Sequence, residues 1–105
     1  MYVQNRHRYL FNTRGQYIGF VAGDNVFTPQ SRWLGFIING NELFSPQGKF
    51  VGYVLDDDRI VRKRDEYPRL PLLPRIPPLP PLPPLPPMPR LPKPPLPHPY
   101  EDVYA

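Results

Sequence analysis

The side chains that could do chemistry are few in this sequence and stand far apart. The only histidines, His7 and His98, are about ninety residues apart, and the chain has no cysteine to serve as a thiolate nucleophile or metal ligand. Ser31 and Ser45 fall in expected turns, where a hydroxyl caps backbone groups. The three adjacent acids at residues 56–58 lack the spacing of an EF-hand and are typical of a solvated turn. We therefore expect no catalytic activity, no cofactor and no metal site.

Basic side chains provide one alternative chemistry, which is binding to phosphates or to another anionic surface. The chain carries a net charge of +4, but residues 1–61 hold six basic and five acidic side chains, so a concentrated basic face is not expected there. Nucleic-acid or anionic-surface binding therefore ranks third among the functions that we consider. Its candidate residues are Arg6, Arg8, Arg62, Lys63 and Arg64.

Proline divides the chain into parts. Of 19 prolines, 17 lie between Pro68 and Pro99, whereas nearly all the aromatic residues precede them. We predict a β-hairpin-repeat domain at residues 1–67, a proline-rich tail at 68–99 and an acidic-aromatic segment at 100–105. A unit of this size buries only about 60% of its unfolded surface, so it needs support from tight packing, self-association or the tail. The sequence shows no signal peptide and no membrane helix, which predicts a cytoplasmic protein.

Three segments of the first part are copies of one unit, with a period of 16 to 17 residues. They are LFNTRGQYIGFVAGDN, VFTPQSRWLGFIINGNE and LFSPQGKFVGYVLDDD. Each contains an aliphatic–Phe pair, a four-residue turn and an apolar run interrupted by glycine. The phenylalanines are Phe11, Phe27 and Phe44, and the glycines are Gly19, Gly35 and Gly52. A fixed period indicates one supersecondary unit stacked on copies of itself.

Each unit is predicted to be a β-hairpin. TPQS and SPQG suit a type I turn, while GDN, NGN and DDD supply residues that tolerate the positive φ of tight links. We expect the phenylalanines to anchor the core and the glycines to mark bends where strands converge on a common axis. DRIVRKR begins a fourth unit, and MYVQN at the N-terminus is a candidate for its partner strand.

The order of phenylalanine, turn glycine and bend glycine in LFNTRGQYIGF and LFSPQGKFVGY, with DRIVRKRDEYP, resembles the bacterial 4-fold beta flower domain. The resemblance covers residues 9–67 and extends to the tail, because such proteins carry Leu-Pro-rich tails that end in a stretch like PYEDVY. We expect an all-β fold of three to four repeated hairpins around a pseudo-fourfold axis, followed by an extended polyproline II tail. The resemblance implies four petals and no assigned activity. TPQS departs from the pattern, with Ser31 where the other turns have Gly15 and Gly48.

The tail repeats every three residues, which is the period of a polyproline II helix. One register, from Pro68 to Pro95, is proline at every step, and a second, from Arg69 to Lys93, is basic at both ends. The third is an unbroken apolar row that we call the leucine stripe: Leu70, Leu73, Ile76, Leu79, Leu82, Leu85, Met88 and Leu91.

A semi-rigid spacer would explain the prolines, but it would not explain eight apolar side chains in strict register. A contiguous exposed apolar row is typical of an interaction site, and aromatic-lined grooves are the usual receptors of polyproline II helices. We therefore predict that the leucine stripe docks on a partner protein, on a sister subunit or on its own domain, with the plain spacer as the alternative. Trp33 and the tyrosines are candidate receptors.

The last residues, HPYEDVYA, leave the proline pattern. They are either a frayed acidic terminus or a latch in which Tyr100 and Tyr104 pin the end of the tail, for example by strand addition.

These patterns together predict a non-enzymatic protein–protein interaction or assembly module. The alternative is a structural subunit of a larger bacterial assembly that is tethered by its tail. Salt distinguishes both from phosphate binding, because docking through leucines persists at high salt whereas binding to phosphates falls steeply.

Overall fold

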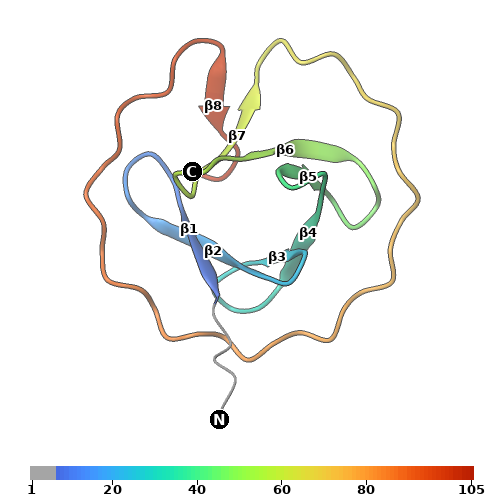
Figure 1. Cartoon of the computed structure of the whole chain (residues 1–105), viewed down its shortest axis with the longest axis horizontal. Coiled ribbons are helices and arrows are strands. Elements are labelled where there is room, and N and C mark those ends of the chain that lie inside the picture. The colour runs from blue at the N-terminus through green and yellow to red at the C-terminus, as the bar shows by residue number, and fades with distance from the viewer. Residues whose placement is uncertain (1–6) are drawn as a thin grey trace.

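The computed structural model describes residues 7–105, and these residues form an all-β structure. Eight strands pair in chain order, each antiparallel to the next, in one sheet that curls about an axis (Figure 1). Within the described range no helix is long and apolar enough to span a membrane. The strands are β1 (Arg8–Phe11), β2 (Tyr17–Ala22), β3 (Asn25–Phe27), β4 (Trp33–Ile38), β5 (Glu42–Phe44), β6 (Phe50–Val54), β7 (Ile60–Lys63) and β8 (Tyr100–Asp102).

Consecutive strands pair into four petals, and the first three are the hairpins that the repeat predicts. We call them petal A (β1–β2), petal B (β3–β4), petal C (β5–β6) and petal D (β7–β8). They are arranged around the axis of Figure 1, and the turns of petals A, B and C point outward. The first strand of each petal places the aliphatic residue of the repeat in the core, where Leu10, Val26, Leu43 and Ile60 are at most 1% exposed.

The phenylalanines of the repeat are buried beside these aliphatic residues. Phe11, Phe27 and Phe44 all belong to the core, and Val61 takes the corresponding place in petal D. Rings from neighbouring petals contact each other, since Phe20 stacks on Phe27 with the ring centroids 5.5 Å apart. The aliphatic–Phe pair therefore binds adjacent petals together as well as filling each one.

Strands of adjacent petals approach each other closely at the glycines within the long strands, Gly19, Gly35 and Gly52. A Cβ atom at any of them would collide with a backbone carbonyl oxygen of the next petal, that of Phe27, Phe44 or Val61. This close approach explains why the repeat keeps a glycine inside a strand, where glycine is otherwise destabilising.

The turns of three petals require a left-handed residue at their last position. Gly15 and Gly48 adopt φ angles of 84° and 91° in petals A and C. Ser31 adopts φ of 65° in petal B, a conformation that costs a residue with a side chain roughly 1–2 kcal/mol. The departure of TPQS from the repeat therefore changes the residue and not the turn.

Petal D corrects one prediction about the chain ends. Its first strand, β7, lies in the predicted DRIVRKR segment, and its second strand is β8, from the C-terminal segment. MYVQN, the expected partner, lies outside the described residues. Petal A meets the link into petal D, where the Phe11 N–H donates to the Asp58 carbonyl over 2.8 Å, and it meets β8, where the Thr13 N–H donates to the Asp102 carboxylate over 3.3 Å. The ring of petals therefore closes within one chain.

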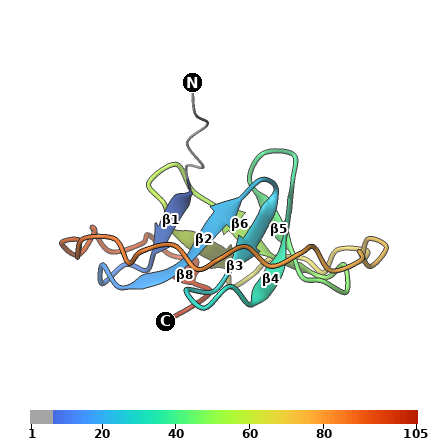
Figure 2. The same ribbon diagram turned by 90° about the horizontal axis from the view of Figure 1, so that it is seen from below.

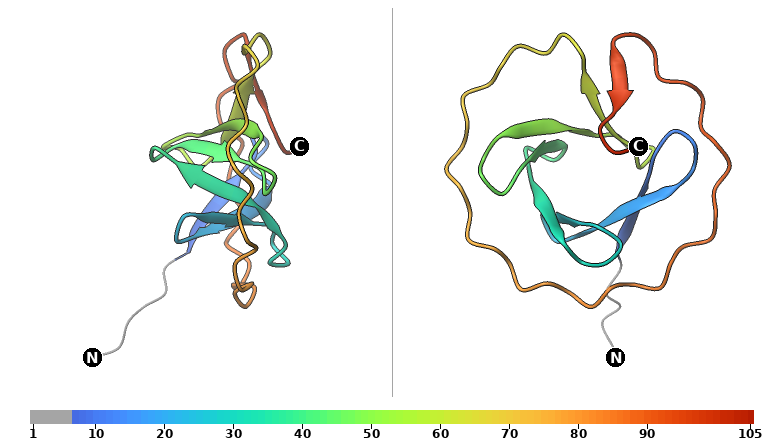
Figure 3. Two further views of the ribbon diagram at one scale, coloured as in Figure 1. Left: turned by 90° about the vertical axis from the view of Figure 1, so that its right-hand side faces the viewer. Right: turned by 180° about the vertical axis from the view of Figure 1, so that it is seen from behind.

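The proline-rich tail encircles the petals. In Figure 1 it leaves β7 in yellow, passes outside petals C, B and A, and returns to β8 in red. Figures 2 and 3 show from the side that it lies in a thin layer around the petals. We call residues 68–99 the belt. The belt contains no helix or strand and returns the chain to the petal from which it starts.

Candidate interaction surface on the belt

The belt presents one edge to the petals and two edges to solvent. From residue 78 onward the half-buried positions recur every three residues, at 78, 81, 84 and 87 and again at 93, 96 and 99. This is the period of a polyproline II helix. We call this register, which begins at Arg69, the inner edge. The all-proline register, or proline edge, is exposed throughout, and so is the leucine stripe.

At petal C the inner edge is held by backbone hydrogen bonds to the SPQG turn. The Leu72 N–H donates to the Gly48 carbonyl over 2.8 Å, and the Arg75 N–H donates to the Pro46 carbonyl over 3.3 Å. The Arg75 guanidinium carbon lies 4.0 Å from the centre of the Phe36 ring. A cation over an aromatic face is attracted to the ring quadrupole, so the side chain of this arginine is held against petal B, next to petal C.

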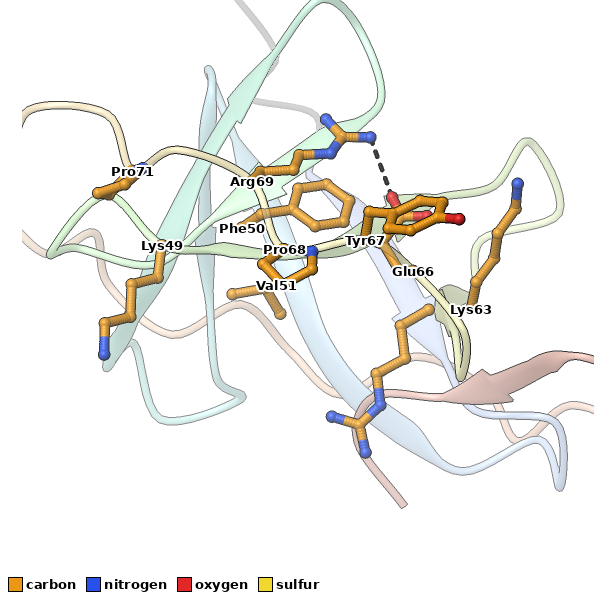
Figure 4. A pocket seen from close by; sticks show the side chains of 10 residues that line it. Lys49, Phe50, Val51, Lys63, Glu66, Tyr67, Pro68, Arg69 and Pro71 are labelled. Atoms are coloured by element: carbon orange, nitrogen blue, oxygen red, sulfur yellow. Dashed lines mark hydrogen bonds and ion pairs between the residues drawn. The ribbon is translucent and has the colours of Figure 1, made fainter.

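Arg69 ties the start of the belt to the side chains of petal C. Its guanidinium carbon lies 3.8 Å from the centre of the Phe50 ring, and it forms ion pairs with Glu42 at 2.7 Å and Glu66 at 3.1 Å. Figure 4 shows Arg69 beside the Phe50 ring, with a dashed line that marks its ion pair with Glu66. The hydrogen bond from Arg69 holds the pKa of Glu42 below its usual value, and hydrogen bonds from Tyr53 and Arg69 do the same for the pKa of Glu66.

At petal A the inner edge is held in the same manner. The Lys93 N–H donates to the Thr13 carbonyl over 2.8 Å. The Arg90 guanidinium carbon lies 4.1 Å from the centre of the Phe11 ring and pairs with Asp58 at 3.0 Å. Both ends of the belt are thus fixed by the same two devices, which are backbone hydrogen bonds to a turn and arginine over a ring.

These contacts recur eighteen residues apart along the belt. Arg75 and Lys93 donate to Pro46 and Thr13, which hold the same position in the turns of petals C and A. Since petal C and petal A are two petals apart, the belt uses nine residues for each petal, or three turns of polyproline II. A further step of nine from Arg90 reaches Pro99, whose carbonyl accepts a hydrogen bond from the Arg64 N–H at petal D.

The turn glycines make room for the belt. A Cβ atom at Gly15 would collide with the carbonyl oxygen of Arg90, and one at Gly48 would collide with that of Leu72. Arg90 and Leu72 are again eighteen residues apart. The two glycines therefore serve both the left-handed turn and the contact with the belt.

The leucine stripe points away from the petals. Its eight side chains are between 83% and 93% exposed. Of the three receptors considered for the stripe, its own domain is therefore not the one in contact with it. The petals offer carbonyl groups and ring faces, which suit the N–H groups and guanidinium groups of the inner edge. One signal in the sequence indicated that the inner edge contacts the petals: the basic residues of the tail all fall in the register from Arg69 to Lys93.

The aromatic residues predicted as receptors are used within the domain. Trp33 is half-buried, and its indole N–H donates to the Gly35 carbonyl over 2.9 Å and to the Asn25 side chain over 3.1 Å. The Tyr9 hydroxyl contacts the belt by donating to the carbonyl of Leu85 over 2.8 Å. This contact is made to the backbone, so it leaves the Leu85 side chain free.

The C-terminal segment forms a latch. Tyr100 begins β8, which pairs with β7, and Val103 and Tyr104 pack against the core. Burial raises the pKa of Tyr104. Glu101 accepts hydrogen bonds from two arginines of petal D and the turn after it, Arg62 at 2.9 Å and Arg64 at 2.7 Å, and these hold its pKa below the usual value. The segment therefore closes petal D by strand addition and is not a frayed terminus.

The basic residues proposed for phosphate binding are mostly engaged by acids of the same chain. Arg8 pairs with Asp58, as Arg62 and Arg64 do with Glu101, and the Lys63 ammonium lies 5.8 Å from the centre of the Tyr100 ring. Arg6 lies outside the described residues. Asp57, from the acidic run, pairs with Arg59 at 2.7 Å.

Two open hollows of about 400 and 430 Å³ lie beside petal C. The first has Phe50, Val51 and Pro68 in its floor, with Lys49 and Lys63 at its sides (Figure 4). The second is lined mainly by apolar groups of petals C and D and of the belt's end. Among residues 7–105 no three His, Cys, Asp or Glu side chains are grouped as metal ligands would be.

Four two-stranded petals around one axis, enclosed by the proline-rich tail of the same chain, define a small all-β hairpin-repeat domain with a self-bound belt. A family model described as "4-fold beta flower protein" matches residues 1–102, and the chain belongs to this family. The family is a small all-β domain of unknown function and is not a known enzyme family. A search of curated proteins and a search of solved structures each found no match.

Proposed function

We propose that this protein is a non-enzymatic interaction or assembly module, and that its leucine stripe is the surface that binds another protein. The petals act as a frame that holds the belt, and the belt displays the stripe. The exposure of the stripe carries the proposal: eight apolar side chains stay at least 83% exposed after the belt has bound its own domain.

Such a surface is costly to leave in water. Burying an aliphatic side chain contributes about 1.5–3 kcal/mol, so eight exposed side chains in one row are a large reserve of binding free energy. Contiguous exposed apolar surface on a folded protein is typical of a protein-binding site. Arg8, Arg62 and Arg64 form ion pairs with acids of the same chain, which leaves less positive charge to bind phosphates. These ion pairs therefore favour protein binding over nucleic-acid binding.

The test is affinity purification of the tagged full-length chain from the cells that express it, in low and high salt. We expect a discrete protein to be retained in both. Changing all eight stripe residues to Gln should reduce its recovery at least about tenfold. Tyr67→Gln is the matched control, because Tyr67 is also a large exposed side chain, at 88%, but lies outside the stripe.

Thermal unfolding accompanies the test, and the midpoint of the stripe variant should match that of the wild type. The proposal fails if the wild type and the stripe variant retain the same proteins. It also fails if the retained material is nucleic acid that high salt removes, since that dependence is the mark of phosphate binding.

A further inference from the structure

The ties between belt and petals are concentrated at the two ends of the belt. Arg69, Leu72 and the backbone of Arg75 are bound at petal C, with the Arg75 side chain on Phe36 of petal B, and Arg90 and Lys93 are bound at petal A. Between Arg75 and Arg90, the described hydrogen bond to the belt is the one from the Tyr9 hydroxyl to the Leu85 carbonyl. We call residues 77–87, with the sequence PPLPPLPPLPP, the central arc.

The central arc exposes two of its three edges. Leu79, Leu82 and Leu85 are 93%, 87% and 84% exposed, and the prolines of the proline edge beside them are exposed as well. The inner-edge prolines at 78, 81, 84 and 87 are half-buried against the petals. A polyproline II helix is a three-sided rod, so a rod with one edge on the petals shows one whole face outward. Here that face is made of alternating leucine and proline.

The central arc is also uncharged, which defines the partner's groove. Residues 76–89 contain no charged side chain. The flanking arginines are turned inward, Arg75 over the Phe36 ring and Arg90 over the Phe11 ring. A complementary groove is therefore apolar and aromatic and has no need of an acidic pocket for arginine.

A second copy of this chain fits the arc less well. The belt is convex around its whole circumference, as Figure 1 shows, so two belts side by side would touch over a short arc only. Stable interfaces bury about 1,200–2,000 Å² in total, which a contact between two convex rims does not provide.

We propose that the central arc is a ready-folded polyproline II ligand for a partner domain with an uncharged, aromatic-lined groove. This inference rests on the proposed function and specifies which part of the stripe binds and what receives it. The leucine and proline edges enter the groove while the inner edge stays on the petals. Because the belt is ordered before binding, little conformational entropy is lost on docking.

The test uses the full-length chain with labelled Leu methyl groups, titrated in turn with a purified WW domain and a purified EVH1 domain, both of which read polyproline II through aromatic grooves. We expect at least one to bind saturably, with shifts at Leu79, Leu82 and Leu85. The triple variant Leu79→Gln, Leu82→Gln, Leu85→Gln should bind at least about tenfold more weakly. The matched control changes three stripe residues outside the arc to Gln: Leu70, Leu73 and Leu91.

Several results would overturn the inference. These are no binding of either domain at millimolar concentration, equal weakening by the control variant, or self-association of the chain in ultracentrifugation. Loss of hydrogen-exchange protection at the Leu72 and Lys93 amides on binding would also overturn it. Such a loss would mean that the tail leaves the petals and binds the partner as a free peptide. If the partner found by affinity purification is lost equally from both triple variants, the proposed function stands and the assignment to the central arc fails.

Discussion

Gly48 shows how one residue can serve a turn and a long-range contact together. Its φ of 91° favours glycine, and its α-carbon faces the carbonyl of Leu72 so closely that a Cβ atom would collide with it. Gly40 has a similar φ of 84° but has nothing within 4 Å of the place where a Cβ would stand. A substitution at Gly40 therefore reports the free energy of the strained backbone alone, whereas a substitution at Gly48 reports that strain together with displacement of the belt.

We predict that Gly48→Ala lowers the free energy of unfolding by about 2–4 kcal/mol, and Gly40→Ala by about 1–2 kcal/mol, because only the first adds a collision to the strain. Hydrogen exchange distinguishes them further. The Leu72 amide should lose protection in Gly48→Ala and keep it in Gly40→Ala. Equal loss of stability with Leu72 still protected in both would show that the belt does not rest on this turn.

The carboxylates around Arg69 give the belt a dependence on pH. Hydrogen bonds from Arg69 and its neighbours lower the pKa of Glu42 and of Glu66 relative to the ordinary value of 4.5. A lowered folded-state pKa means that the stabilisation is present above the unfolded value and is lost as the pH falls through the folded value.

We therefore predict that the tie between Arg69 and petal C weakens on acidification below about pH 4.5. Hydrogen exchange of the Leu72 amide, measured from pH 6 down to pH 3 and corrected for intrinsic rates, should report it. Glu42→Gln should already have reduced protection at pH 6 and a flatter pH profile. An unchanged profile in Glu42→Gln would contradict the role assigned to this ion pair.

At the scale of elements, the repeat was enough to predict the petals but not the last one. Phe11, Phe27 and Phe44 recur with their glycines because each unit meets the same neighbours, and such a period is visible in sequence. β8 comes from YED, about forty residues after β7, and the repeat does not extend to it, so strand addition was only one of two options for this segment and no partner strand was named. Pairing between distant segments depends on the path of the belt, which sequence periodicity does not describe.

The orientation of the belt was equally hidden. Its period of three predicted three faces, but apolarity favoured the leucine stripe as the docking face. The petals instead present turn carbonyls and ring faces, and these select the register of Arg69, Arg75 and Arg90. Nine belt residues span the distance from one petal to the next. This distance depends on the folded ring of petals, so the sequence alone does not show it.

The latch can be tested at its contact with the core. Val103 is half-buried against the core cluster, so Val103→Lys should lower the free energy of unfolding by about 1–3 kcal/mol, because it replaces an apolar contact with the core by a charged side chain. The matched control is Leu73→Lys, at a belt side chain that is 86% exposed, and its effect should stay within about 0.5 kcal/mol. Chemical denaturation measures both. A neutral Val103→Lys would mean that β8 is not needed to close petal D.

At the scale of the whole molecule, the belt joins the petals into one unit. It crosses petals C, B and A, and the segment that follows it supplies the final strand of petal D, so its two ends are fixed by the fold. A domain of this size has little core of its own, and the belt adds contacts along its rim without disulfides. The same arrangement places the leucine stripe outside, which ties the stability of the fold to the display of the proposed binding surface.

Limited digestion with trypsin tests this arrangement most directly. The bonds after Arg69, Arg75 and Arg90 each precede a non-proline residue, so all three are cleavable in a free tail. Because the three guanidinium groups lie over Phe50, Phe36 and Phe11, we predict cleavage at least about tenfold slower than in a synthetic peptide of residues 66–95. Cleavage of the native protein at the rate of the peptide would contradict the account, because the belt would then be a free tail.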